Sequence, residues 1–213
     1  NSVFVSGKYA YMASAATNEL QIYDVTNPNS PASIGSADLG GTGNSIYVSG
    51  KYAYLARAAA GGTCTSTTTT GCELLIYDVS NPVSPLFMGG ADLGIGANSV
   101  FVSGKYVYIG QASATGNDLT IYDISNPISP FLVGGADPAQ AINSVYVSGK
   151  YAYLGTAATN EFQIYDISNP ANPLLISSTS TGTTAINSVF VSGRFTYLGD
   201  SDSSGTLRIY DVS

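Results

Sequence analysis

The stretch that decides the fold is NSIYVSGKYAYL, residues 44–55, which is followed after a loop by LLIYDVSNPVSP, residues 74–85. In the first stretch, Gly50 and Lys51 separate two short runs of β-branched and aromatic residues, a pattern that predicts two strands joined by a tight hairpin turn. In the second stretch, two prolines end the strand because proline cannot donate to the ladder. Neither stretch has helical periodicity, so the sequence predicts an all-β class.

This pair of stretches repeats along the whole chain. Copies of the Asn-Ser opening begin at Asn1, Asn44, Asn98, Asn143 and Asn187, at spacings of 43, 54, 45 and 44 residues. A period in the forties with regular glycine, proline and β-forming residues is typical of the blades of a β-propeller. We therefore predict one domain, residues 1–213, divided into units 1–43, 44–97, 98–142, 143–186 and 187–213.

Each unit contains four strand candidates, which in the first copy are residues 2–6, 9–13, 20–25 and 32–37. Large side chains lie on both pleat faces of these strands, so each sheet needs cover on both sides, as radial stacking of blades provides. The fifth unit stops after its third strand. We expect a closed disc of five four-stranded antiparallel blades, the last lacking its outer strand. A fragment of a longer chain, or a strand supplied by a neighbouring molecule, are the alternatives.

The third strand of each unit carries a resemblance to a known family. Units that read Leu-x-Ile-Tyr-Asp-Val/Ile-Ser/Thr-Asn-Pro-x-x-Pro are similar to the LVIVD-repeat family of bacterial and archaeal surface propellers. The eponymous strand falls on residues 20–24, 74–78, 119–123, 162–166 and 207–211, with tyrosine where the family name has its second valine and with Phe162 for the opening leucine. The resemblance implies display outside the cell or in the cell envelope, and it supplies no catalytic motif.

Composition excludes several functions. The 213 residues include 14 acidic and 7 basic side chains, with a formal net charge of −7 and no histidine. Without histidine there is no imidazole base, no Ser-His or Cys-His pair and no histidine metal ligand. The sparse basic residues cannot neutralise many phosphates, so nucleic acid and anionic membranes are poor partners. No apolar run approaches the roughly 18 residues of a membrane span.

The acidic residues gather on one predicted rim. In an up-and-down blade, the second turn and the crossover to the next blade share one face of the disc. We predict an interaction rim there, for a protein partner or a second copy, made of Glu19, Asp38, Glu73, Asp92, Asp118, Asp137 and Glu161. The other face is nearly balanced in charge, because it carries the first-turn Lys and Arg residues together with the aspartates that open the Asn-Pro turns. We interpret these aspartates as caps of the turn rather than as ligands.

Two features interrupt the repeat. Cys64 and Cys72 flank an enlarged, threonine-rich loop, and two thiols eight residues apart in a chain without histidine favour a disulfide over a metal site. A disulfide indicates an oxidising compartment. Asp200 and Asp202 begin a run that is similar to the start of a calcium loop, although its twelfth position, Asp211, belongs to every unit. We expect no cofactor, and calcium at Asp200 and Asp202 is the alternative that stays open.

We hypothesise a non-catalytic extracellular or cell-surface propeller that acts as an interaction or assembly scaffold and self-associates through the acidic rim or the incomplete blade edge. The alternative is a lectin-like propeller that binds glycans at one sugar site between neighbouring blades. A glycosidase or lyase that uses only carboxylates comes third, since Asp38, Asp92 and Asp137 could converge near the channel. Blade rotation separates these three aspartates, which counts against catalysis.

Overall fold

The computed structural model describes residues 1–112, 116–157, 160–182, 185–201 and 207–213, and all regular structure in these ranges is β-strand. Blade 1 consists of β1 (Ser2–Ser6), β2 (Tyr9–Ala13), β3 (Leu20–Asp24) and β4 (Ala32–Ala37). Blade 2 consists of β5 (Gly43–Ser49), β6 (Tyr52–Arg57), β7 (Leu74–Asp78) and β8 (Leu86–Ala91). Blade 3 consists of β9 (Ala97–Ser103), β10 (Tyr106–Gln111), β11 (Leu119–Asp123) and β12 (Phe131–Ala136).

Blade 4 consists of β13 (Ile142–Ser148), β14 (Tyr151–Thr156), β15 (Phe162–Asp166) and β16 (Leu174–Thr179), and blade 5 of β17 (Ile186–Ser192), β18 (Phe195–Asp200) and β19 (Leu207–Asp211). Each blade is an antiparallel sheet in sequence order. The all-β class, the five blades and the three-stranded last blade are therefore confirmed. The described part of the chain holds no helix long and apolar enough to cross a membrane.

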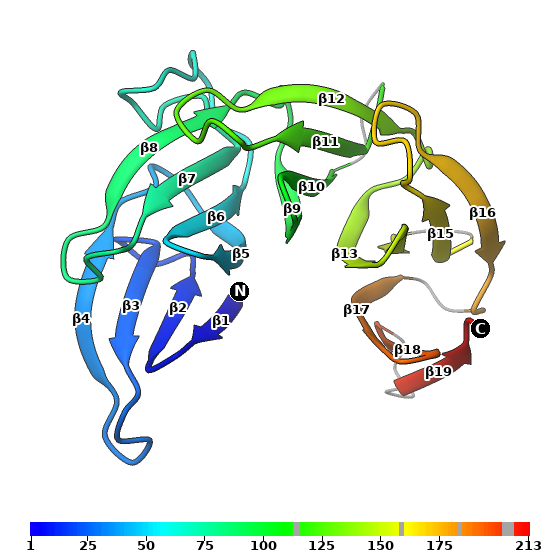
Figure 1. Ribbon diagram of the computed structural model, residues 1–213, viewed down its shortest axis with the longest axis horizontal. Coiled ribbons are helices and arrows are strands. Elements are labelled where there is room, and N and C mark those ends of the chain that lie inside the picture. The colour runs from blue at the N-terminus through cyan, green and yellow to red at the C-terminus, as the bar shows by residue number, and fades with distance from the viewer. Residues whose placement is uncertain (113–115, 158–159, 183–184, 202–206) are drawn as a thin grey trace.

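The blades are arranged as a propeller, with β1, β5, β9, β13 and β17 on the inside and β4, β8, β12 and β16 on the outside (Figure 1). Apolar side chains fill the space between neighbouring blades. Between blades 1 and 2, for example, Leu20 and Ile22 pack with Leu55 and Leu75, and all four are fully buried. Burial on both sides of each inner sheet explains why the strands carry large apolar residues on both pleat faces.

The Asn-Ser opening of each unit joins one blade to the next. The asparagine amide donates to a carbonyl at the start of the following innermost strand, as from Asn44 to Ala97 at 2.8 Å. The serine hydroxyl accepts a backbone N–H from that same strand, as Ser99 does from Val145 at 3.0 Å. These bonds recur between successive blades from β1 to β17. The most repetitive residues of the sequence are therefore inter-blade connectors.

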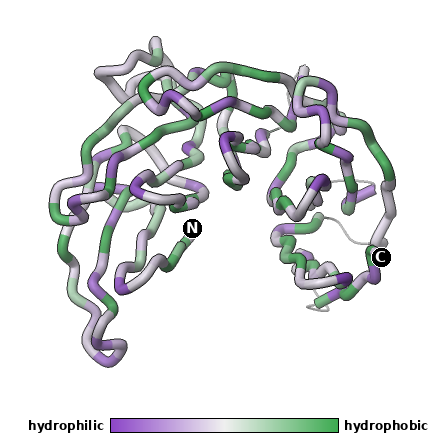
Figure 2. Tube along the Cα trace, in the orientation of Figure 1, coloured by the Kyte–Doolittle hydropathy of each residue, from purple (hydrophilic) through white to green (hydrophobic). Residues whose placement is uncertain are grey.

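The five blades form an open arc, so the expectation of a closed disc is wrong. Figure 1 shows blades 1 and 5 at opposite ends of the arc, without the contact that joins each interior pair. Val3 and Val5 on β1 are 61% and 59% exposed, and Leu207 and Ile209 on β19 are 68% and 56% exposed. Hydrophobic residues run along the strands of the terminal blades as they do along the inner ones (Figure 2). The angle between neighbouring blades sets how many blades close a ring, and the repeat pattern does not encode it in readable form.

Candidate functional site

The enlarged loop of blade 2 is closed by the predicted disulfide. The sulfur atoms of Cys64 and Cys72 are bonded, and the Cys72 side chain is fully buried against the core between blades 1 and 2. A short bridge between Thr65 and Thr68 makes a narrow hairpin of the loop tip. The prediction of a disulfide is confirmed, and the loop is anchored to the core through Cys72.

The rim formed by the first and third turns is built from pairs of opposite charge. Each Lys or Arg of the first turn lies 2.8 to 3.8 Å from the aspartate that opens the Asn-Pro turn. The other oxygen of each aspartate accepts the N–H of the residue two positions later, as Asp78 does from Ser80 at 2.9 Å. These aspartates are caps, as the sequence predicted.

Hydrogen bonds lower the pKa of these aspartates. The hydroxyl of Ser80, the Lys51 ammonium and a backbone N–H lower the pKa of Asp78 to about 2. Lys105 and Ser125 do the same for Asp123, whose pKa is also about 2.

Three members of the predicted interaction rim are buried. Glu73, Asp118 and Glu161 are 1%, 1% and 3% exposed, and Glu19 is half-buried. Each of these four carboxylates precedes a third strand and accepts an N–H from the following crossover, as Glu19 does from Leu39 and Glu73 from Leu93. The backbone N–H groups of the crossover need acceptors where they are buried, and these carboxylates supply them. The carboxylates therefore hold the crossover onto the blade and present little charge to solvent.

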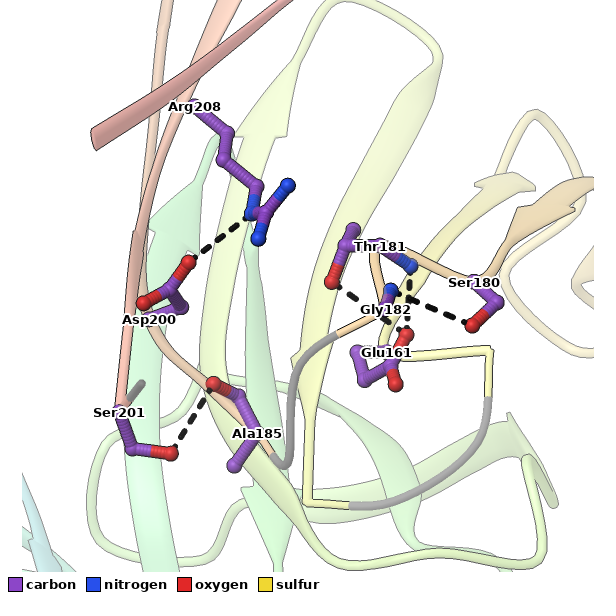
Figure 3. Close-up of polar contacts among 8 residues, drawn as sticks. All are labelled: Glu161, Ser180, Thr181, Gly182, Ala185, Asp200, Ser201 and Arg208. Carbon is purple, nitrogen blue, oxygen red and sulfur yellow. Dashed lines mark hydrogen bonds and ion pairs between the residues drawn. The ribbon is translucent and has the colours of Figure 1, made fainter. Parts of the chain in front are cut away.

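Burial alone would raise the pKa of Glu161, but hydrogen bonds from backbone N–H groups and from Ser180 and Thr181 outweigh it, and the pKa lies below its ordinary value. Thr181 donates both its N–H and its hydroxyl to Glu161 (Figure 3). Glu161 is therefore a structural carboxylate held in its charged form.

The exposed part of the predicted rim is Asp38, Asp92 and Asp137. Each of these aspartates accepts the N–H of the residue two positions later, at 2.7, 2.9 and 2.6 Å. They cap equivalent crossover turns on successive blades.

The predicted calcium position falls partly outside the described residues. Asp202 lies in the range 202–206, which the structure does not describe. Asp200 is described: its side chain is buried, and its Oδ2 accepts a hydrogen bond from Arg208 Nε at 2.9 Å (Figure 3). Among the described residues, no cluster of three or more His, Cys, Asp or Glu side chains could hold a metal ion.

The copies differ from one another at two positions that face the preceding blade. One lies directly after the shared part of the second strand, and the other is the second residue of the third strand. The pairs, from blade 1 to blade 5, are Ser14 and Gln21, Arg57 and Leu75, Gln111 and Thr120, Thr156 and Gln163, and Asp200 and Arg208.

In blade 2, this position is occupied by a buried arginine. Arg57 is 1% exposed, and its Nη1 donates to the carbonyl of Leu39. Its Nε and Nη2 have no hydrogen-bond partner in the structure. Burial lowers the pKa of Arg57, while the nearby charges of Glu73, Tyr77 and Glu19 act in the opposite direction.

In blade 3, the same position adjoins a pocket of about 320 Å³. The pocket lies under the crossover from blade 2, against β10, β11 and β12. Its lining residues are Asp92, Leu93, Ile95, Gln111, Asn117, Thr120, Tyr122 and Leu132. Gln111 Oε1 and Thr120 Oγ1 are buried without a hydrogen-bond partner. Burial raises the pKa of Tyr122, and the charges of Asp92 and Glu73 raise it further.

Among these lining residues, the sequence assigns a site role only to Asp92, and Tyr122 is expected to pack between blades. Gln111 and Thr120 could have been found by comparing the five repeat units and looking for equivalent positions at which the residue type changes from one unit to the next. Where five units are nearly superimposable, the positions that vary next to conserved neighbours mark what is specific to one blade. Charged residues that recur in the units, such as Glu73 and Asp118, are instead the ones that the blades need for folding.

Solved structures with a similar fold include proteins of quite different origin. A putative 6-phosphogluconolactonase from Bacteroides uniformis superposes with a TM-score of 0.75 at 14% identity, over 100% of this chain and 67% of that one. The periplasmic gluconolactonase of Pseudomonas aeruginosa gives 0.73 at 13% identity, over 99% and 65%. The computationally designed Ika8 protein gives 0.66 at 12% identity, over 99% and 57%.

At these identities the likeness shows the fold alone, and this chain spans 57% to 67% of the length of these propellers. No curated protein matches the sequence. The LVIVD-repeat profile, in contrast, matches residues 1–38, 40–61, 70–92, 96–137, 141–181 and 185–213, which include the third strand of every blade. With the repeat, the blades and the eponymous strands all in agreement, the chain belongs to the LVIVD-repeat family.

Proposed function

We propose that this protein is a non-catalytic scaffold of the cell exterior that assembles by packing the first blade of one copy onto the last blade of another. The observation that supports this is the chemistry of the two ends of the arc. Val3 and Val5 occupy the positions of Ile46 and Val48, which are 4% and 6% exposed inside the arc. Leu207 and Ile209 occupy the positions of Leu74 and Ile76, which are fully buried.

The two end faces are therefore the two halves of the interface that every interior pair of blades already makes. Joining blade 1 of one copy to blade 5 of another would remove these apolar side chains from water, which is worth roughly 25 cal/mol per Å². Such a head-to-tail contact is heterologous and extends into a filament unless the rotation closes it. Blade 5 also leaves the edge of β19 without the outer strand that completes the other blades.

Placement outside the cell is supported by the disulfide, since such bonds persist in oxidising compartments. The non-catalytic part of the proposal is supported by the use of the rim carboxylates as caps and crossover anchors. Two of the structural neighbours carry gluconolactonase names, so hydrolysis of gluconolactone is the activity to assay. Turnover above the buffer rate would contradict the non-catalytic part.

The experiment is sedimentation velocity of two double variants, Val3→Asp with Val5→Asp and Leu207→Asp with Ile209→Asp. We expect the unmodified protein to grow in size with concentration and each variant alone to stay monomeric. Each variant keeps one intact face, so an equal mixture of the two should form a dimer and nothing larger. Leu86→Asp, at a residue that is 64% exposed on β8 away from both end faces, is the matched control and should assemble normally.

An unmodified protein that remains monomeric at high concentration would contradict the proposed assembly. A mixture of the two variants that fails to dimerise would contradict its head-to-tail geometry.

A further inference from the structure

The pocket of blade 3 is lined by polar groups without hydrogen-bond partners, and its third-strand tyrosine differs in this respect from the tyrosines of blades 1, 2 and 4. In blades 1 and 4, the third-strand tyrosine donates its hydroxyl to a glutamine on the same strand: Tyr23 to Gln21 at 3.0 Å and Tyr165 to Gln163 at 3.1 Å. In blade 2, Tyr77 donates to the carbonyl of Asp38 at 3.2 Å. Tyr122, the counterpart in blade 3, makes no hydrogen bond with any described residue.

Two further polar atoms in the same pocket have no partner. Gln111 is 2% exposed and donates Nε2 to the carbonyl of Leu93 at 3.4 Å, but its Oε1 accepts nothing. Thr120 is 9% exposed, and its hydroxyl neither donates nor accepts. A buried polar group without a partner costs about 1 to 3 kcal/mol, so a cluster of such groups beside a cavity indicates a missing ligand.

The groups that face the pocket define the chemistry of that ligand. Gln111 Oε1 can only accept, the Thr120 hydroxyl can do both, and the Tyr122 hydroxyl can donate. Leu93 and Leu132 add apolar surface. Hydroxyl groups on a carbon ring satisfy all of these at once, because each hydroxyl donates and accepts while the ring carbons pack on leucine.

The size of the pocket and the charge of its lining restrict the class of ligand further. A volume of about 320 Å³ lies at the lower end of the range for small-molecule sites, roughly 300 to 1,000 Å³. Asp92 brings negative charge to the lining, and the pKa of Tyr122 is raised first by burial and then by the charges of Asp92 and Glu73. The lining has no Lys or Arg, so an anionic ligand would be repelled without compensation.

We infer that the pocket between the blade 2 crossover and blade 3 binds a neutral sugar of monosaccharide size, held by Gln111, Thr120 and Tyr122. Asp92 and Leu132 are exposed, so the pocket opens to solvent on the same rim as the disulfide-closed loop. This site does not depend on assembly of copies, since all of its lining residues belong to one chain.

The test is a nuclear magnetic resonance titration of the isotope-labelled protein with glucose, galactose, mannose, N-acetylglucosamine and glucuronate. We expect at least one neutral sugar to shift the amide resonances of residues 92–95 and 117–122 in a saturable way at millimolar concentration. We expect glucuronate to bind more weakly than the best neutral sugar because of Asp92.

Two variants link the binding to the pocket. Thr120→Val keeps the shape and removes the hydroxyl, so affinity should fall roughly 3- to 10-fold. Thr120→Gln introduces the residue that blade 4 has at this position, which would fill the space and give Tyr122 a partner; binding should be lost. The control is Thr196→Val, which removes another buried hydroxyl without a partner, on β18, and should leave affinity unchanged.

The inference is overturned if no neutral sugar shifts these resonances, or if the shifts map elsewhere on the arc. It is equally overturned if both Thr120 variants bind as the unmodified protein does, or if glucuronate binds best. Melting temperatures of all three variants show that each is folded, so a loss of binding reports on the pocket.

Discussion

The aspartate that opens each Asn-Pro turn makes two different contacts with one carboxyl group. One oxygen accepts a backbone N–H, and the other lies near the lysine or arginine of the first turn. Both contacts are stronger with the charged form, which is why the pKa of Asp78 and of Asp123 lies at about 2. The ordinary value is 3.8.

A depressed pKa predicts how stability depends on pH. Asp78 and Asp123 contribute stability at pH values above about 4, and this contribution is lost as the pH falls through about 2. We expect the melting temperature to fall steeply in this window. Replacing both residues by asparagine keeps an oxygen for the turn but removes the charge, so the drop should be shallower. Circular dichroism melts from pH 5 to about 2 check this, and an unchanged slope in the double variant would contradict it.

At the scale of the element, the innermost strands are connected by side chains as well as by packing. The Ser99 hydroxyl accepts the N–H of Val145 in a buried hydrogen bond between β9 and β13. Ser188 occupies the same position on β17 but is exposed, because no blade follows it in the structure. The same residue type therefore has a structural role at one position and none at the other.

Ser99→Ala should lower the free energy of unfolding by about 1 to 3 kcal/mol, because it leaves the Val145 N–H buried without an acceptor. Ser188→Ala should change it by less than about 0.5 kcal/mol, as is usual for a surface substitution. Urea denaturation of the two variants measures the difference. Equal effects would mean that the serine hydroxyl does not connect the blades.

Much of the element scale could be predicted from the sequence. The strands expected at residues 2–6, 9–13 and 32–37 are observed with those bounds, and the third ends one residue earlier than expected, at Asp24. Glycine and proline punctuation locates the turns because these residues restrict the backbone locally. The burial of Glu73 could not be read in this way, since it depends on N–H groups of two other segments, Ala60 in the enlarged loop and Leu93 in the crossover. Buried atoms without a hydrogen-bond partner, such as Gln111 Oε1, could not be predicted either, because segments far apart in sequence bury them.

At the scale of the whole molecule, the arc is a one-dimensional array in which each blade contacts only its neighbours. Blades 2, 3 and 4 each have two neighbours, and blades 1 and 5 have one. In such arrays, stability is approximately a sum of unit and nearest-neighbour terms, so the ends open before the middle.

Native-state hydrogen exchange should show this gradient. We expect the slowest amides in β6, β7, β10 and β11, and the fastest exchange in β18 and β19 at concentrations where the protein is monomeric. Protection in blade 5 should rise with protein concentration if end faces associate as proposed. Uniform protection along the arc at low concentration would contradict the nearest-neighbour description.

The backbone hydrogen bond that closes the second turn in blades 1 to 4 has a consequence for how the chain can change. Arg57 N–H donates to Glu73 O at 2.9 Å, just as Ser14 does to Glu19 and Thr156 to Glu161, although many more residues intervene in blade 2. Each of these turns is thus an insertion site, where added residues leave the register of the two flanking strands unchanged. The disulfide-closed hairpin is one insertion already carried there, and equivalent grafts on other blades would place several different loops along one rim.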